Sequence, residues 1–155
     1  MAVYQLTTEQ KLTTSIDAIW DFISSPRNLQ KITPDYMGFD ITSENLPEKM
    51  YPGMIIRYKV SPLLGLKMTW VTEITHVVDK SYFVDEQRVG PYKIWHHQHR
   101  IVPIKKGVLM TDQVTYVPPM GILGAMANKM IIRKKLNEIF EYRRTVLADS
   151  FGEVE

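Results

Sequence analysis

The feature that most constrains the fold is a series of six segments, between Gly38 and Pro118, in which apolar and polar residues alternate. A period of two predicts β-strands, because successive side chains of a strand point to opposite faces of a sheet. The connections between the last five segments are only a few residues long, which suits antiparallel neighbours. We therefore predict an antiparallel sheet with strands at Phe39–Glu44, Met54–Val60, Met68–Val77, Tyr82–Arg88, Ile94–Pro103 and Val108–Val117.

One further strand and three helical segments flank this series. They are a strand at Val3–Thr13, a helix capped by Thr14 or Ser15 and ending near Ser24, a helical turn at Asn28–Ile32, and a long helix at Gly121–Ala148. This order of elements is typical of an α+β fold with helices on one side of an antiparallel sheet. We expect the long helix to lie across a strongly curved sheet and to leave a cavity beneath it.

The size and composition favour a single domain over residues 1–155. Apolar residues make up 45% of the chain and charged residues 23%, which is ordinary for a packed globular protein. The chain has no run of about 20 apolar residues and no secretion signal, so we expect a cytoplasmic protein without a membrane-spanning segment. The formal charge of +2 is too small to favour nucleic-acid binding, and the lack of cysteine excludes disulfides and thiolate chemistry.

Strand parity predicts which side chains face the cavity. The segment Ile94–Pro103 mixes polar and apolar residues on both faces, but its neighbours each have one apolar-rich face. Pairing across the short turns then places Asp85 opposite His97, His99 near Asp112, and Thr72 beside Asp85. The predicted ligand-binding residues are Trp70, Thr72, Asp85, Gln87, Trp95, His97, His99, Met110, Asp112 and Tyr116 on the sheet, with Met126 and Met130 as lid residues on the long helix.

The polar residues of this wall allow three interpretations. Asp85, His97, His99 and Asp112 satisfy one another's hydrogen bonds, or they orient a polar group of a bound molecule whose apolar part is held by aromatic and Met side chains. The third interpretation is general acid–base catalysis, with His97 or His99 as the base and Tyr116 as a hydrogen-bond donor.

Other kinds of chemistry have less support. A metal site is disfavoured, because alternating residues of one strand converge less well than a helical pair of histidines. The sequence contains no nucleophile elbow, phosphate loop or dinucleotide fingerprint. We therefore expect no cofactor.

Two stretches carry a resemblance to a known superfamily. FVDEQRVGPYKIWHHQH (Phe83–His99) and MTDQVTYVPPMG (Met110–Gly121), with Ile32-Thr33-Pro34 and the order of elements, resemble the START and pollen-allergen-like helix-grip superfamily (SRPBCC). The most similar branch is that of small bacterial stand-alone domains often labelled cyclase/dehydrase-like. The resemblance implies a curved antiparallel sheet of about seven strands around a long C-terminal helix, with an internal cavity. The superfamily includes lipid carriers, hormone receptors and aromatase/cyclases, so the resemblance is more specific for fold than for function.

Two apolar loops, Ser61–Leu66 and Pro118–Gly124, lie near the cavity mouth in the fold that the resemblance implies. Three roles remain open for them: an apolar entrance, a surface that contacts a membrane or partner (for the first loop through Leu63–Leu66), or two loops that cover one another.

We predict that the protein binds a small, mostly hydrophobic molecule, lipid-, polyketide- or aromatic-like, between the sheet and the C-terminal helix. A cavity of about 300–1,000 Å³ is typical of such sites. One alternative is a cyclase- or dehydratase-like enzyme that uses the His and Asp residues of the cavity. The other is a membrane-peripheral or interaction module that uses the Leu63–Leu66 loop.

Overall fold

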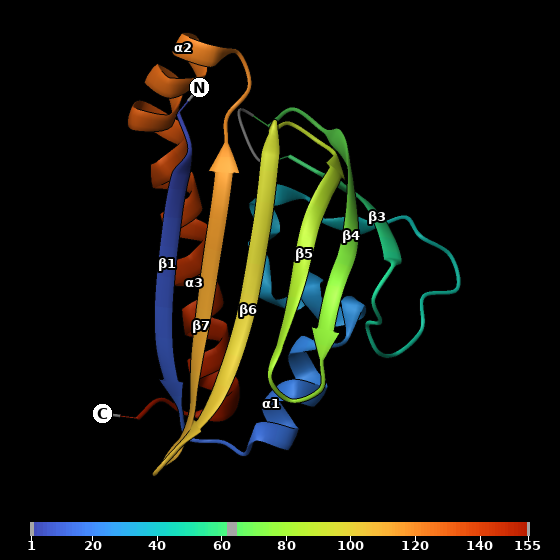
Figure 1. Cartoon of the computed structure of the whole chain (residues 1–155), viewed down its shortest axis with the longest axis vertical. Coiled ribbons are helices and arrows are strands. Elements are labelled where there is room, and N and C mark those ends of the chain that lie inside the picture. The colour runs from blue at the N-terminus through green and yellow to red at the C-terminus, as the bar shows by residue number, and fades with distance from the viewer. Residues whose placement is uncertain (1, 62–64, 155) are drawn as a thin grey trace.

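The computed structural model describes residues 2–61 and 65–154, and its centre is a seven-stranded antiparallel sheet (Figure 1). The strands are β1 (Tyr4–Leu12), β2 (Asp40–Ile41), β3 (Met54–Val60), β4 (Met68–Val78), β5 (Tyr82–Val89), β6 (Ile94–Ile104) and β7 (Gly107–Val117). Their order across the sheet is β1-β7-β6-β5-β4-β3-β2, so the first strand joins the sheet beside the last. The predicted α+β layout is confirmed.

The helices lie on one face of this sheet, behind the strands in Figure 1. The short ones near the N-terminus are α1 (Ile16–Ile23), η1 (Pro26–Ile32) and η2 (Asp35–Met37). The single helix predicted at Gly121–Ala148 is instead α2 (Gly121–Ala127), a π-helical turn η3 (Asn128–Ile132) and α3 (Arg133–Phe151). Among the described residues, no helix is long and apolar enough to span a bilayer.

The second predicted strand is shorter than the alternation suggested. The backbone N–H groups of Thr42 and Ser43 both donate to the carbonyl of Arg57, at 2.8 and 3.1 Å, and the Arg57 N–H donates to Ser43 Oγ at 2.7 Å. A side-chain hydroxyl thus replaces a backbone acceptor, which ends the ladder after Ile41.

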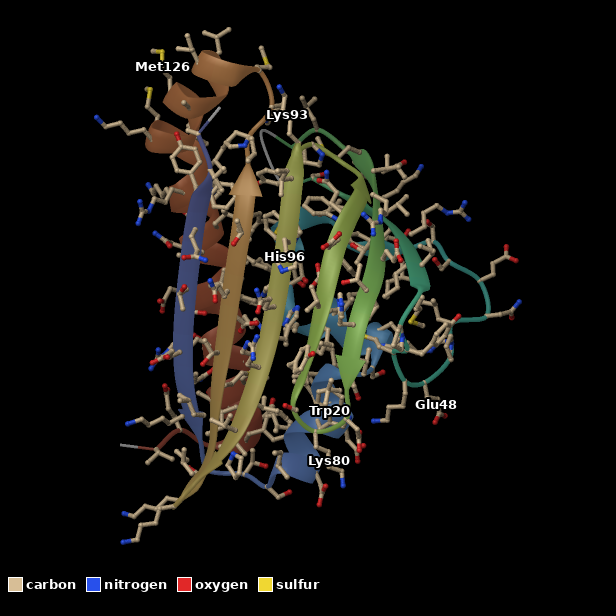
Figure 2. The ribbon with its side chains drawn as sticks, viewed as in Figure 1. Trp20, Glu48, Lys80, Lys93, His96 and Met126 are labelled. Atoms are coloured by element: carbon tan, nitrogen blue, oxygen red, sulfur yellow. The ribbon has the colours of Figure 1, made fainter. Side chains whose placement is uncertain are left out.

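The predicted register is confirmed around the two histidines. Asp85 of β5 pairs with His97 of β6, and His99 pairs with Asp112 of β7. His97 and His99 are buried on the helix-covered face. His96 lies on the opposite, outer face (Figure 2), as the parity of the strand requires.

The predicted pairing of Thr72 with Asp85 is wrong. Thr72 lies opposite Gln87, and Ile74 lies opposite Asp85. Regular pairing from Val78 and Tyr82 at the turn would place Thr75, not Thr72, opposite Asp85. The irregularity between Ile74 and His76 then shifts the partner of Asp85 by one residue, to Ile74, and a second irregularity lies between Val71 and Thr72.

Two apolar clusters fill the space between sheet and helices. One packs α1 and the end of α3 against the sheet and includes Leu12, Ile19, Trp20, Ile74, Phe83, Ile101, Met110 and Leu147. The other packs the start of α3 and includes Val60, Trp70, Tyr92, Val114, Tyr116, Ile132, Leu136 and Phe140. The buried histidines connect the two: the ring of His99 stacks on Phe83 at 4.0 Å and that of His97 contacts Phe140 at 5.5 Å. Polar groups therefore lie in the middle of an otherwise apolar interior.

Candidate functional site

A cavity of about 150 Å³ lies between the sheet, the segment from η1 to η2, and α3. This volume is smaller than the range expected from the sequence. The sheet contributes Tyr58, Val60, Trp70, Thr72, Ile74, Phe83, Asp85, Tyr92, Trp95, His97 and His99. The remaining lining residues are Leu29, Ile32, Thr33, Met37, Phe39 and Met50 before the sheet, and Lys135, Leu136, Ile139, Phe140 and Arg143 on α3. The lining is thus mostly apolar, with its polar groups concentrated at the two histidines.

Aromatic rings form one half of this wall. The Trp70 ring lies 6.1 Å from that of Tyr58 in a stacked arrangement and 5.3 Å from that of Trp95, edge to face. Thr72 Oγ1 accepts a hydrogen bond from Trp70 Nε1 at 3.1 Å and shares another with the Tyr58 hydroxyl at 2.9 Å. The polar atoms of the rings are therefore satisfied, and their flat faces are held in fixed positions.

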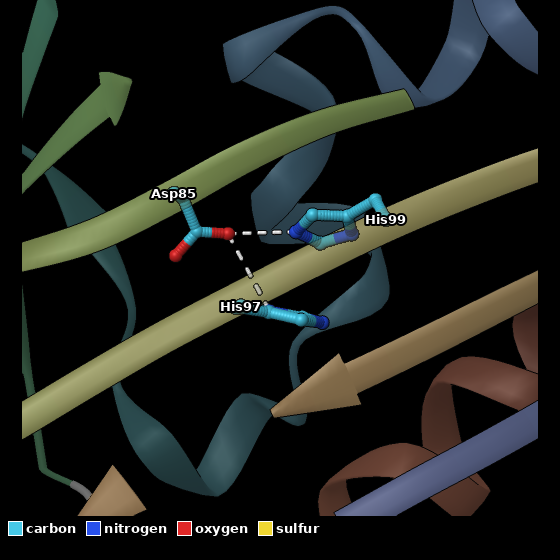
Figure 3. A group of neighbouring side chains, drawn as sticks. All are labelled: Asp85, His97 and His99. Atoms are coloured by element: carbon cyan, nitrogen blue, oxygen red, sulfur yellow. Dashed lines mark hydrogen bonds and ion pairs between the residues drawn. The ribbon is translucent and has the colours of Figure 1, made fainter. Parts of the chain in front are cut away.

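The other half contains five ionisable side chains, Asp85, His97, His99, Asp112 and Arg143, which we call the charged cluster. Asp85 Oδ2 lies 2.6 Å from His99 Nε2 and 3.4 Å from His97 Nδ1 (Figure 3). On the far side of the imidazoles, Asp112 Oδ1 lies 3.1 Å from His97 Nε2 and 2.9 Å from His99 Nδ1. Both imidazoles thus lie between two carboxylates.

Arg143 completes the charged cluster from α3. Its Nη1 lies 3.4 Å from Asp112 Oδ1 and its Nη2 lies 3.3 Å from His99 Nδ1. The side chain is buried, and its Nε has no hydrogen-bond partner within the described part of the chain. A buried N–H group without an acceptor is costly, and Arg143 borders both this cavity and a second hollow near β1.

Sequence reasoning missed Arg143, although a signal for it exists. Arg143 lies on the buried stripe of α3 with Leu136, Phe140 and Leu147, at helical spacing. A charged residue inside such a stripe has to find a buried partner. The acidic residue that meets it, Asp112, was already predicted to face the same space.

Burial and the charged neighbours of each side chain set the protonation states in the charged cluster. Burial opposes ionisation of Asp112, but Arg143 and the two imidazoles outweigh it and hold the pKa of this carboxyl well below its usual value. The pKa of Asp85 is lowered as well, since His97, His99 and Arg143 outweigh its desolvation. Both carboxylates are therefore ionised near neutral pH.

The two histidines shift in opposite directions. Burial and the neighbouring His99 charge lower the pKa of His97. For His99, burial also opposes the charge, but the bonds to Asp112 and Asp85 outweigh it and raise the pKa. With His99 protonated and His97 neutral, the two carboxylates are balanced by the imidazolium and the guanidinium. The charged cluster then has no net charge, which lowers the cost of its burial.

Three side chains of the charged cluster lie close enough together to bind a metal ion. One ligand atom each from Asp85, His97 and His99 lies within 4.8 Å of the others. The convergence arises because Asp85 comes from the adjacent strand, whereas the expectation against a metal considered one strand alone. Two imidazoles and a carboxylate suit zinc or iron. An ion there would replace the hydrogen bond between Asp85 and His99.

The structure brings six of the predicted site residues to the cavity: Trp70, Thr72, Asp85, Trp95, His97 and His99. Asp112 lies behind the histidines and borders a second, polar hollow of about 160 Å³ near β1. Tyr116 is buried against Tyr4 and Tyr92, and Met110 is part of the apolar cluster at α1. Gln87 bonds both backbone polar groups of Tyr92, at 2.6 and 3.1 Å, so it shapes the β5–β6 turn.

The expected lid residues require a correction. Met126 and Met130 are 58% and 71% exposed and are not among the residues that line the cavity. Figure 1 shows the reason: α2 extends past the ends of β1 and β7, so it does not cover the cavity between the sheet and α3. The cavity is covered from the helix side by Leu136, Ile139 and Phe140 of α3, in place of the expected Met126 and Met130. Of the loop residues Leu63–Leu66, Leu63 and Leu64 lie outside the described residues, and Leu66 is 64% exposed.

Comparisons with known proteins identify the architecture. No family model and no curated protein matches the chain. Among solved structures, protein CV1439 from Chromobacterium violaceum has a TM-score of 0.70 at 12% identity, with 97% of this chain and 99% of that one covered. Ginseng major latex-like protein 151 from Panax ginseng has a TM-score of 0.67 at 10% identity, with 96% of this chain and 97% of that one covered. Ara h 8.0201 has a TM-score of 0.60 at 11% identity, with 96% of this chain and 99% of that one covered.

These likenesses confirm the helix-grip fold that the sequence resemblance implied. At such low identity they show the fold alone. The bacterial cyclase/dehydrase-like branch remains a prediction.

The role of Arg143 can be tested by its removal. Arg143→Met leaves Asp112 without its guanidinium partner, so we expect a loss of about 3–5 kcal/mol in the free energy of unfolding, measured by urea denaturation. The neighbouring Arg144 is an exposed arginine whose ion pair is with Glu153, so Arg144→Met should cost less than about 1 kcal/mol. Adding Asp112→Asn to Arg143→Met should recover part of the loss. Equal losses in the two single variants would contradict this assignment.

The raised pKa of His99 predicts a pH-dependent contribution to stability. A raised pKa in the folded state stabilises the protein fully below the unfolded value of about 6.5, and this contribution disappears as the pH rises through the folded pKa. The stability difference between the wild type and His99→Gln should therefore be larger at about pH 6 than at about pH 9. Urea denaturation at both pH values measures it. A difference that increases with pH would mean that His99 is held neutral.

Proposed function

We propose that the protein binds a small, neutral, mostly apolar molecule in the cavity between the sheet and α3. The observation that carries this proposal is an aromatic-lined cavity bordered by Arg143, a side chain whose buried Nε has no hydrogen-bond partner among the described residues. An apolar pocket with a few convergent polar groups is the usual form of a small-molecule site.

The volume of the cavity limits the size of the ligand. A closed apolar cavity of about 150 Å³ has room for a molecule the size of benzene, and this cavity has the same volume. A single substituted ring therefore fits without rearrangement. A lipid or polyketide would require the mouth to widen.

We place the mouth of the cavity between η2 and the first turns of α3, where Lys135 borders it. Lys135 Nζ lies 5.1 Å above the ring centre of Tyr36 and 2.7 Å from Glu138 Oε2. Lys135 itself borders the cavity, and Tyr36 is 56% exposed. These contacts are exposed and individually weak, so they allow a ligand to enter between η2 and α3.

The charged cluster selects the polar group of the ligand. When His99 is protonated the charges of the cluster balance, so a charged ligand would leave a net charge in the interior, whereas a neutral one would not. An oxygen acceptor would satisfy Arg143 Nε. Asp85, whose side chain is 16% exposed, offers an acceptor to a hydroxyl group. A phenol-like or hydroxylated ring matches both requirements.

A variant that fills the cavity tests the proposal. Ile139 lines the cavity from α3, so Ile139→Trp should occupy the space of the ligand, whereas Asn137→Trp places the same ring on the exposed side of the helix. With 4-fluorophenol as the probe, followed by fluorine NMR, we expect saturable binding to the wild type and to Asn137→Trp. Ile139→Trp should bind at least about tenfold more weakly, a change of about 1.4 kcal/mol.

Fluorobenzene serves as the ligand control, because it fills the same volume without a hydroxyl group and should bind more weakly than 4-fluorophenol. Two results together would overturn the proposal: no saturable binding of either probe, and a bare chain in native mass spectrometry of the freshly purified protein.

A second candidate function is acid–base catalysis on a carbonyl-containing molecule in the same cavity. The observation in its favour is His97, which borders the cavity, has a lowered pKa and lies between two carboxylates. A neutral imidazole in such a position can accept a proton near neutral pH.

His97→Gln separates the two candidates, because Gln keeps a polar side chain but cannot take up a proton. For a binding protein we expect the probe affinity to change by less than about tenfold and any co-purifying molecule to remain unmodified. If the wild type converts that molecule and His97→Gln retains it unchanged, catalysis is the function.

A further inference from the structure

The end of the molecule that carries α2 exposes large apolar side chains. Ile122 is 83% exposed, Leu123 62%, Met126 58% and Met130 71%, and Met120 just before the helix is 69% exposed. Figure 2 shows Met126 at the extreme end of the molecule, beyond the strands. Apolar residues so concentrated on one element are unusual for a surface that contacts only water.

The packing of α2 explains why its large side chains point outward. The buried residue of α2 is Gly124. A Cβ atom at this position would lie 1.8 Å from the carbonyl oxygen of Pro119. The helix thus packs through its small residues, Gly124 against Pro118 and Pro119 and Ala127 against the apolar cluster at the start of α3, and the bulky residues are left on the other side.

The stretch of chain that carries this apolar surface contains basic residues and no acidic residue. No Asp or Glu occurs between Asp112 and Glu138. Lys129, Arg133 and Lys134 within that stretch are exposed. The β5–β6 turn at the same end adds the exposed Lys93 (Figure 2).

We propose that this end of the molecule docks onto the surface of an anionic phospholipid membrane. Ile122, Leu123 and Met126 enter the boundary between head groups and acyl chains, and the basic residues bind the phosphate groups, as interfacial amphipathic helices do. The helix lies on the membrane and does not cross it. The proposal is independent of the ligand cavity, which is formed by other residues.

Charge complementarity favours a membrane over a second copy of the chain. A symmetric dimer through α2 would bring Lys129, Arg133 and Lys134 of both copies together without an acidic partner from the same stretch. An anionic bilayer supplies the missing negative charge. The same reasoning predicts that binding weakens with salt.

Vesicle co-sedimentation of the full chain tests the proposal. We expect saturable binding to vesicles of equal parts phosphatidylglycerol and phosphatidylcholine, at least tenfold weaker binding to phosphatidylcholine alone, and weaker binding at high salt. No binding to the anionic vesicles, or equal binding to both kinds, would overturn the proposal.

Matched variants locate the surface. Ile122→Asp with Leu123→Asp, and separately Lys129→Glu with Lys134→Glu, should each reduce anionic-vesicle binding at least tenfold, since each basic residue near such a surface contributes roughly fivefold. The controls lie at the opposite end of the molecule: Val78→Asp, also at an exposed apolar residue, and Lys105→Glu with Lys106→Glu in the β6–β7 turn. These should bind like the wild type. All substituted residues are exposed, and thermal unfolding monitors their folding.

Two further outcomes count against the proposal. Equal losses of vesicle binding in Lys129→Glu/Lys134→Glu and in Lys105→Glu/Lys106→Glu would show attraction by the overall charge of the protein alone. A dimer seen by sedimentation equilibrium that disappears in Ile122→Asp/Leu123→Asp would assign the surface to a second copy. Ile139→Trp should retain vesicle binding, so that failure of the ligand proposal and failure of this one are distinguishable.

Discussion

The buried pair of Arg143 and Asp112 is the interaction on which the rest of the site depends. It links α3 to β7 in the middle of an apolar interior, where neither charge could remain alone. Asp112 also bonds His97 and lies close to His99, and His99 continues the network to Asp85 on the next strand. The position of the helix across the sheet is therefore coupled to the protonation of two histidines.

This coupling explains how the interior holds both a cavity and a set of charges. The charged cluster takes up the space that apolar side chains of α3 would otherwise fill, and its balance of charge keeps the cost of burial low. Beyond it, Trp70 and Tyr58 are fixed by hydrogen bonds to Thr72 and do not collapse into the remaining space. The cavity is thus bounded by groups whose positions are set by directional bonds, which suits a site that is preformed for its ligand.

The two ends of the long helical segment present their apolar side chains to different surroundings. α3 presents Leu136, Phe140, Arg143 and Leu147 to the interior, whereas α2 presents its large apolar residues to the outside. The π-helical turn between them, Asn128–Ile132, carries an additional residue per turn, so it changes the phase of one helix relative to the other. One continuous helical segment thus carries both the exposed apolar surface proposed for membrane docking and part of the cavity wall.

The sequence by itself determined most of the strands and the parity of the residues around the two histidines, and its resemblance to a known superfamily implied the helix-grip layout. Alternation is a local property, and it correctly placed His97 and His99 inside, with Asp85 and Asp112 as their cross-strand partners. Tertiary structure alone decided the partner of Thr72, because bulges along β4 displaced the pairing. It also decided the volume of the cavity, the exposure of Met126 and Met130, and the contact of Arg143 with Asp112. These features depend on where a distant helix comes to rest on the sheet and how closely its side chains pack there, and no local periodicity encodes that distance.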